Sequence, residues 1–144
     1  MTVYTKARVL FICTGNSARS QMAEAFLRRL AGDRFEVYSA GLEPKPIHPL
    51  VYQVMGELGY DLAGHEPKDI RQFLGRMHFG YLITVCDRAA RNCPFFPGIG
   101  QRQDWSIEDP SAFEGSQEER LTKFREVRDA LLARVEAFVA ETAD

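Results

Sequence analysis

The sequence predicts an α/β protein, a small open doubly wound parallel sheet of about four strands with helices on both faces. Short continuous apolar runs, which are typical of strands buried on both sides, alternate along the chain with apolar stripes at helical spacing. The length of 144 residues suits one domain, and the hydrophobic share of 45% is that of an ordinary folded protein. We therefore expect residues 1–144 to form a single domain whose parallel strands are joined by right-handed crossovers.

The first half of the chain supplies two strands and two helices. Residues 9–13 form a continuous apolar run after Arg8, which predicts a strand over residues 8–13 that is buried on both faces. Apolar side chains at helical spacing predict a helix over residues 22–30, and Gly32 ends it. Residues 35–39 predict the second strand, and the apolar stripe over residues 51–58 predicts the second helix.

The second half contains the clearest strand and the longest helix. A short helix is predicted near residues 70–74, followed by a strand over residues 81–86. Residues 87–100, with their prolines and glycines, predict a long loop, in which the Ala-Ala-Arg-Asn stretch of residues 89–92 is suited to form a helical turn. Residues 101–105 predict a short fourth strand. Apolar side chains at helical spacing predict a long amphipathic helix over residues 121–138. Because ligands bind beyond the carboxyl ends of such strands, this edge of the sheet is the expected site. Cys13 and Cys86 each end a predicted strand, so we expect both thiols to lie at this edge.

The composition excludes several classes of protein. The 18 Lys and Arg against 20 Asp and Glu give a net charge of −2, which excludes a nucleic-acid binder with a broadly basic surface. No stretch approaches the roughly 20 apolar residues of a membrane span or the core of a signal peptide. Three cysteines, an odd number, argue against a secreted disulfide scaffold. We expect a cytoplasmic protein with reduced thiols and with neither a nucleic-acid nor a membrane partner.

The loop between the first strand and the first helix suits a tetrahedral anion. It consists of a cysteine, five residues, then Arg and Ser, and it lacks the Gly-Lys-Ser/Thr ending of a Walker loop. Small residues let the backbone curl so that successive N–H groups point inward, and the following helix adds the positive end of its dipole. We expect the oxyanion to be bound by Thr14, Gly15, Asn16, Ser17, Ala18, Arg19 and Ser20.

Cys13, at the start of this loop, is the candidate nucleophile. An electropositive loop favours its thiolate, and the Ser20 hydroxyl is placed to donate a hydrogen bond to the sulfur. Arg19 presents a planar fork that grips two oxygens at once, and Asn16 tolerates the left-handed backbone that such a loop needs. The plainer interpretation is a buried cysteine at the end of a strand. The position of this motif between strand and helix favours an active site.

The chain resembles the low-molecular-weight protein tyrosine phosphatase superfamily. The resemblance is carried by residues 9–25, by Ser39-Ala-Gly41 and by Asp109-Pro110, and it extends from about residue 9 to residue 138. It implies a phosphatase-like fold in which Cys13 is the nucleophile and Asp109 the general acid. An Asp-Pro pair also starts turns readily, so Asp109 is a weaker signal than the loop.

Within the superfamily, the sequence is more similar to the thioredoxin-coupled arsenate reductases. Residues 84–98 resemble their redox segment, with Cys86 and Cys93 seven positions apart. The phosphatases usually have two tyrosines after Asp-Pro, where this chain has Ser111-Ala112. Many relatives have a cysteine in place of Ala18, and the polar residues that hold a structural potassium ion in some relatives are not matched around residues 66–69. We therefore predict no metal and no cofactor.

The resemblance implies a reaction that uses all three thiols. Arsenate, with phosphate or sulfate as a mimic, enters the loop, and Cys13 attacks arsenic while Asp109 supplies a proton. Cys86 then attacks Cys13, arsenite leaves, and Cys93 attacks Cys86 to free Cys13. Thioredoxin is the expected reductant. Because Cys86 and Cys93 must approach within about 7 Å, we predict that residues 87–97 differ between the reduced and oxidised states.

Two other functions compete with arsenate reduction. A low-molecular-weight phosphatase acting on phosphotyrosine or a small phosphoester would use the same Cys13, Arg19 and Asp109. Cys86 and Cys93 separate the two hypotheses, because a hydrolase cycle needs neither thiol. A non-catalytic anion- or partner-binding module is the third hypothesis, and the intact nucleophile argues against it. Zinc binding is disfavoured because the cysteines and histidines lack zinc-ligand spacing.

Overall fold

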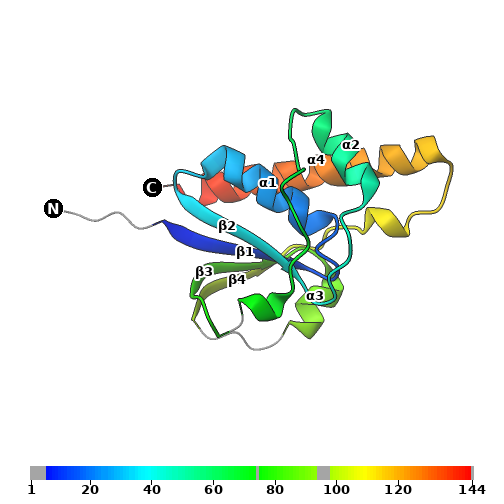
Figure 1. Ribbon diagram of the computed structural model, residues 1–144. Coiled ribbons are helices and arrows are strands. Elements are labelled where there is room, and N and C mark those ends of the chain that lie inside the picture. The colour runs from blue at the N-terminus through cyan, green and yellow to red at the C-terminus, as the bar shows by residue number, and fades with distance from the viewer. Residues whose placement is uncertain (1–5, 74, 94–97, 144) are drawn as a thin grey trace.

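A computed structural model describes residues 6–73, 75–93 and 98–143 of the chain (Figure 1). Its centre is a four-stranded sheet in which every neighbouring pair is parallel and the strand order is β2-β1-β3-β4. This confirms the predicted fold class of an open parallel sheet with helices. The strands are β1 Ala7–Cys13, β2 Phe35–Gly41, β3 Phe79–Thr84 and β4 Ile99–Asp104.

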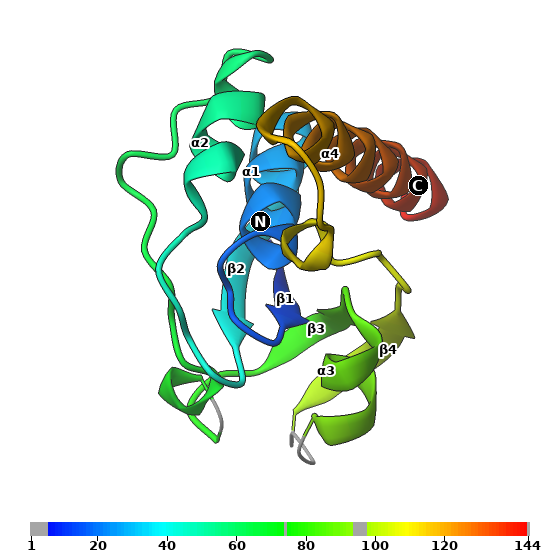
Figure 2. The ribbon, with the colours of Figure 1, turned by 90° about the vertical axis from the view of Figure 1, so that its right-hand side faces the viewer.

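Helices cover both faces of the sheet unequally (Figures 1 and 2). The long helices α1 (Arg19–Ala31) and α4 (Gln117–Glu141) lie on one face, and α2 (Pro49–Gly56) packs against α4. The opposite face carries the short helix α3 (Asp87–Asn92) and the one-turn 3-10 helix η1 (Ile70–Gln72). No helix in the described part of the chain has both the length and the apolarity to cross a bilayer.

The core forms around β1, whose residues Val9 to Cys13 are at most 2% exposed. A strand in the middle of a parallel sheet has both faces covered, which is why its sequence is continuously apolar rather than alternating. Aromatic rings fill the space between the sheet and α4: Phe138 contacts Phe35, Tyr81 and Trp105. The helical stripe predicted over residues 121–138 is therefore the buried face of α4.

Two sequence-based predictions differ from the structure. Residues 87–100 were expected to form a loop, but α3 occupies Asp87–Asn92 and β4 begins at Ile99. The helix forms because the Cys86 sulfur caps it by accepting from the Ala89 N–H at 3.3 Å, and because two alanines favour helix. The strand predicted to end at Cys86 ends at Thr84. Leu74, predicted in the short helix, and residues 94–97, predicted in the loop, lie outside the described residues.

The strand order reverses direction between β1 and β3, which are neighbours in the sheet although β2 separates them in sequence. The segments that follow β1 and β3 therefore leave the same edge of the sheet and run to opposite faces. Such a switch point is where parallel sheets bind their ligands. Cys13 ends β1 and Cys86 follows β3 by two residues, so the expectation that both thiols lie at one edge is confirmed.

Candidate active site

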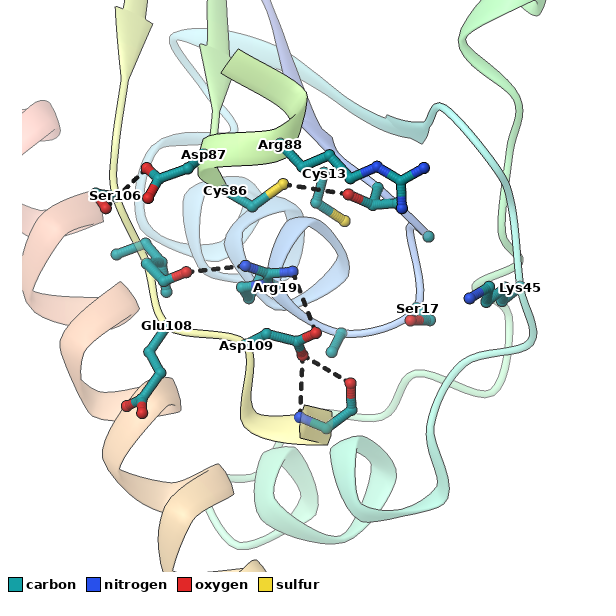
Figure 3. Close-up of a pocket in the computed structure, with 15 residues that line it drawn as sticks. Cys13, Ser17, Arg19, Lys45, Cys86, Asp87, Arg88, Ser106, Glu108 and Asp109 are labelled. Carbon is teal, nitrogen blue, oxygen red and sulfur yellow. Dashed lines mark hydrogen bonds and ion pairs between the residues drawn. The ribbon is translucent and has the colours of Figure 1, made fainter. Parts of the chain in front are cut away.

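A cavity of about 610 Å³ opens at the switch point (Figure 3). It combines the loop after β1, the start of α3 and the segment that precedes α4. The described residues that line it are Cys13, Thr14, Gly15, Ser17, Ala18, Arg19, Lys45, Cys86, Asp87, Arg88, Ser106, Ile107, Glu108, Asp109 and Ser111. The structure therefore brings Cys13, Arg19, Cys86 and Asp109, predicted from three separate segments, to one place.

The loop after β1 is shaped by outward hydrogen bonds. The carbonyls of Thr14, Gly15 and Ser17 accept hydrogen bonds from the N–H groups of Glu43, Lys45 and His48 at 2.8, 2.9 and 3.0 Å. A turn whose carbonyls point outward has its N–H groups available for the concave side, which is how backbone nests bind anions.

The same loop lies against Gly41 at the end of β2. A Cβ at position 41 would lie 2.8 Å from the nitrogen of Asn16 and from the oxygen of Thr14. Glycine at this position therefore allows the close approach of the loop to the sheet.

Cys13 lies at the bottom of the loop and is 2% exposed. Its sulfur accepts a hydrogen bond from the Asn16 N–H at 3.1 Å and lies 2.8 Å from the Ser20 hydroxyl. Asn16 has a φ of 51°, the left-handed conformation that the sequence predicted for this position. Both contacts are suited to stabilise a thiolate, because hydrogen bonds to a charged acceptor favour the charged form.

A buried network fixes the direction of the Ser20 bond. Ser39 donates its hydroxyl proton to the Glu24 carboxylate, so Ser39 accepts from the Asn16 amide nitrogen at 3.0 Å. The same amide nitrogen donates to Ser20 at 2.7 Å, which leaves the Ser20 hydroxyl proton for the sulfur of Cys13. Glu24 is only 4% exposed, and its carboxylate thus orients the Ser39 hydroxyl, the Asn16 amide and the Ser20 hydroxyl in turn.

Sequence patterns alone do not reveal Glu24 or the residues that surround it. Glu24 lies on α1 among apolar residues, and its charge is balanced by Arg28 at 2.9 Å and Lys68 at 3.7 Å. The Lys68 N–H also donates to the Asn16 side-chain oxygen at 2.8 Å. Glu24 does not belong to the apolar stripe that predicted this helix, so the sequence carried no signal that its carboxylate is buried.

Arg19 and Asp109 face each other across the cavity (Figure 3). Arg19 begins α1, donates to the Ile107 carbonyl at 2.9 Å and lies 3.7 Å from an Asp109 oxygen. The other Asp109 oxygen accepts from the Ser111 N–H at 3.0 Å and from its hydroxyl at 2.7 Å, so Asp109 caps the turn η2 (Pro110–Ala112). Asp109 therefore both caps a turn and lines the cavity beside Arg19.

Cys86 reaches the loop from the segment between β3 and α3. Its sulfur lies 3.5 Å from the Thr14 hydroxyl and caps the start of α3, and the residue is 3% exposed. Cys13 and Cys86 thus line one cavity although the chain separates them widely (Figure 3). The placement allows one sulfur to approach the other from across the anion site.

Cys93 follows the other end of α3 and is half-buried. Burial raises the pKa of its thiol, an effect that Arg102 opposes and Asp104 reinforces. All three cysteines are free. Seven residues of helix rise about 10 Å, which exceeds the roughly 7 Å within which two Cα atoms can be joined by a disulfide.

Two cations at the cavity were not predicted from the sequence. Lys45 lines it from the loop that follows β2, and Arg88 lines it from α3. Arg88 forms an ion pair with Glu43 at 3.0 Å, and both side chains are more than half exposed. Their positions depend on tertiary structure, because each is an ordinary surface residue in its own segment.

Comparison with known proteins assigns the family. A sequence model of the low molecular weight phosphotyrosine protein phosphatases matches residues 8–144. The chain belongs to this family. The arsenate reductase of Shouchella clausii is 39% identical over 140 residues, which are 97% of this chain and 99% of that protein. The arsenate reductase of Bacillus subtilis is 37% identical over 134 residues, 93% of this chain and 95% of that protein.

Solved structures agree with this assignment to the phosphatase family. A structure described as an arsenate reductase in the phosphate binding state has a TM-score of 0.80 at 32% identity, covering 95% of this chain and 99% of its own. Another, described as an arsenate reductase in oxidized state, has a TM-score of 0.78 at 33% identity over 94% of this chain and 98% of its own. The resemblance predicted from residues 9–25 and 84–98 is confirmed, including its closer likeness to arsenate reductases.

Proposed function

We propose that this member of the phosphatase family reduces arsenate to arsenite with a relay of three thiols. One observation carries the proposal: the sulfurs of Cys13 and Cys86 line the same anion cavity, and Cys86 lies 3.5 Å from the hydroxyl of Thr14 in the Cys13 loop. Hydrolysis of a phosphoester needs the first thiol and not the second. The arsenate reductases that the chain resembles support the same choice.

In the first step, arsenate binds in the loop of residues 13–20, and the Cys13 thiolate attacks arsenic. The backbone N–H groups and Arg19 hold the oxygens, since a guanidinium binds two of them side by side. Asp109 gives its proton to the oxygen that leaves as water. The position of its carboxyl group on the cavity wall, close to the arginine that would hold the anion, supports this role.

The next two steps transfer electrons from thiols to arsenic. The Cys86 thiolate attacks the Cys13 sulfur, the electron pair of the sulfur–arsenic bond passes to arsenic, and arsenite leaves. A Cys13–Cys86 disulfide remains. The Cys93 thiolate then attacks the Cys86 sulfur, which forms the Cys86–Cys93 disulfide and releases Cys13 as a thiolate. A dithiol reductant, proposed to be thioredoxin, reduces this disulfide and completes the cycle.

The last thiol transfer requires helix α3 to open. Cys86 and Cys93 lie at its two ends, and the helical rise between them is about 10 Å, too long for a disulfide. The short length of α3 favours opening, because a six-residue helix has little stability of its own. A cytoplasmic location, in which reduced thiols persist between turnovers, fits this cycle.

Hydrolysis of small phosphoesters remains the second candidate, because Cys13, Arg19 and Asp109 serve it equally well. The lining of the cavity argues against phosphotyrosine as the substrate. None of its described residues is aromatic, whereas a phenyl ring is best held between apolar or aromatic walls. Apart from Ile107, the described walls are mostly charged or small, which suits a compact inorganic oxyanion.

The decisive experiment measures arsenate-dependent NADPH oxidation with thioredoxin and thioredoxin reductase, beside hydrolysis of para-nitrophenyl phosphate. We expect Cys86→Ser and Cys93→Ser to lose arsenate turnover at least a hundredfold and to retain hydrolysis within about threefold. Cys13→Ser loses both. Wild-type protein without arsenate-dependent NADPH oxidation, or parallel loss of both activities in Cys86→Ser, would establish the phosphatase instead.

A further inference from the structure

The C-terminal end of α3 is held by a residue from the edge strand. Arg102 of β4 donates from its Nη2 to the carbonyl oxygen of Ala90 at 2.5 Å. The carbonyl of Ala90 would ordinarily accept from the N–H four residues later, but that residue is Pro94, which has no N–H. Arg102 therefore supplies a donor that the helix cannot provide.

Arg102 is itself fixed to the sheet. Its Nε donates to the carboxylate of Asp104 at 3.1 Å, and the same carboxylate oxygen accepts from the buried Thr84 hydroxyl at 2.6 Å. Arg102 and Asp104 are two residues apart along β4, so their side chains lie on the same face of the sheet, the face that α3 covers. The planar guanidinium thus bridges a fixed carboxylate and the backbone of the helix, a geometry that a lysine ammonium cannot reproduce fully.

The charge of Arg102 also acts on Cys93, the residue that ends α3. Burial raises the pKa of this thiol, and the positive charge of Arg102 lowers it. One side chain therefore contacts the helix that separates the two thiols and influences the thiol at its far end.

We propose that Arg102 is a positioning residue that holds α3 in its helical form while Cys86 and Cys93 are reduced. The inference rests on the proposed function, because it concerns the disulfide that closes the thiol relay. Joining Cys86 to Cys93 takes residues 87–92 out of the helix, and the bond from Arg102 to Ala90 is lost. Arg102 therefore favours the dithiol over the disulfide and keeps Cys86 at the cavity until substrate has reacted.

The test measures the dithiol–disulfide equilibrium without arsenate. Cys13→Ala is introduced into every variant so that Cys86 and Cys93 are the only thiols, and the protein is equilibrated with mixtures of oxidised and reduced dithiothreitol. The oxidised reagent accepts two electrons and two protons as the protein disulfide forms, and alkylation followed by mass measurement counts the remaining thiols. We expect Arg102→Gln to shift the equilibrium about tenfold toward the disulfide, a potential about 30 mV more negative.

Two further variants separate the hydrogen bond from the charge. Arg102→Lys keeps the charge and one donor, so its shift lies between those of wild type and Arg102→Gln. The control is Arg91→Gln, which removes an exposed charge from the same helix. The Arg91 side chain has no hydrogen bond or ion pair with the rest of the described chain, so the dithiol–disulfide equilibrium of this variant stays within twofold of wild type. Equal shifts in Arg102→Gln and Arg91→Gln, or a shift toward the dithiol, would overturn the proposal.

Hydrogen exchange of the reduced proteins gives a readout that needs no disulfide. The amides of residues 87–92 exchange about tenfold faster in Arg102→Gln than in Arg91→Gln if Arg102 holds the helix. If no variant forms the Cys86–Cys93 disulfide, the proposed relay is wrong while this comparison still decides the role of Arg102. Equal exchange rates in the two variants would then reject it.

Discussion

Cys13 and Cys86 line one cavity, yet different kinds of contact hold the segments that carry them. The Cys13 loop is fixed by buried bonds: Asn16 is fully buried and contacts both Ser20 and Ser39. The helix after Cys86 buries Ala89, but its side-chain links to other segments are mostly single and exposed, including the pair of Arg88 with Glu43 and the bond from Ser106 to Asp87. One region resists any change of geometry, and the other opens at little cost.

This difference matches the two tasks in the proposed cycle. An anion site must keep its donors in place through repeated attack by the same sulfur, and preorganised donors are the largest source of such catalysis. The Cys86 sulfur must move away from Cys13 to form its disulfide with Cys93, and a rigid helix would prevent this movement. Matched substitutions in the two regions test this difference.

The largest effect is expected for Asn16→Ala. The substitution leaves Ser39, Ser20 and the Lys68 N–H without their amide partner and places alanine at a φ of 51°. We expect a loss of about 3 kcal/mol in the free energy of unfolding and at least a hundredfold slower alkylation of Cys13 at neutral pH. Urea unfolding and iodoacetamide kinetics measure the two effects.

The matched change on α3 is Asn92→Ala, which removes an exposed bond to the Arg88 carbonyl and costs under about 0.5 kcal/mol. Asn16→Gly keeps the left-handed backbone accessible and separates the amide contacts from the strain of alanine. Similar losses for Asn16→Ala and Asn92→Ala would show that the two regions are equally rigid and would remove the basis of the comparison.

The next effect concerns the pH dependence of the final thiol transfer. Because burial raises the pKa of Cys93, its thiolate fraction and the rate of attack on Cys86 increase about tenfold per pH unit, up to and beyond pH 8.5. The measurement mixes reduced protein with arsenate in the absence of thioredoxin, quenches with acid and counts the Cys86–Cys93 disulfide. Cys93→Ser is the control, because it stops at the Cys13–Cys86 disulfide at every pH. A rate that does not change with pH would show that opening of α3, and not the Cys93 thiolate, limits the step.

The sequence predicted the anion loop itself better than the buried residues that hold the loop in place. Residues 13–20 combine chemistry and local geometry in one segment, so Asn16 with positive φ and Ser20 beside the sulfur followed from residue type and position. Glu24 could not be recognised, because its partners Ser39 and Lys68 come from distant segments. Helix α3 was foreseen only as a helical turn within a loop, because six residues are too few to show a helical period and its cap is a cysteine rather than a usual capping residue.

The smallest effect is expected for Ser106→Ala, and its matched partner is Ser39→Ala. Ser106 donates to Asp87 at 2.9 Å where both side chains reach water, so its loss costs under about 0.5 kcal/mol. Ser39 is fully buried, and its loss removes the hydroxyl donor to Glu24 and one of the two acceptors of the Asn16 amide nitrogen, at a cost of about 2 kcal/mol. Urea unfolding gives both values.

Despite its small effect on global stability, Ser106→Ala raises hydrogen exchange in residues 87–92, because the start of α3 loses a link to the rest of the chain. A Ser106→Ala protein with unchanged exchange would mean that α3 opens from its Arg102 end alone.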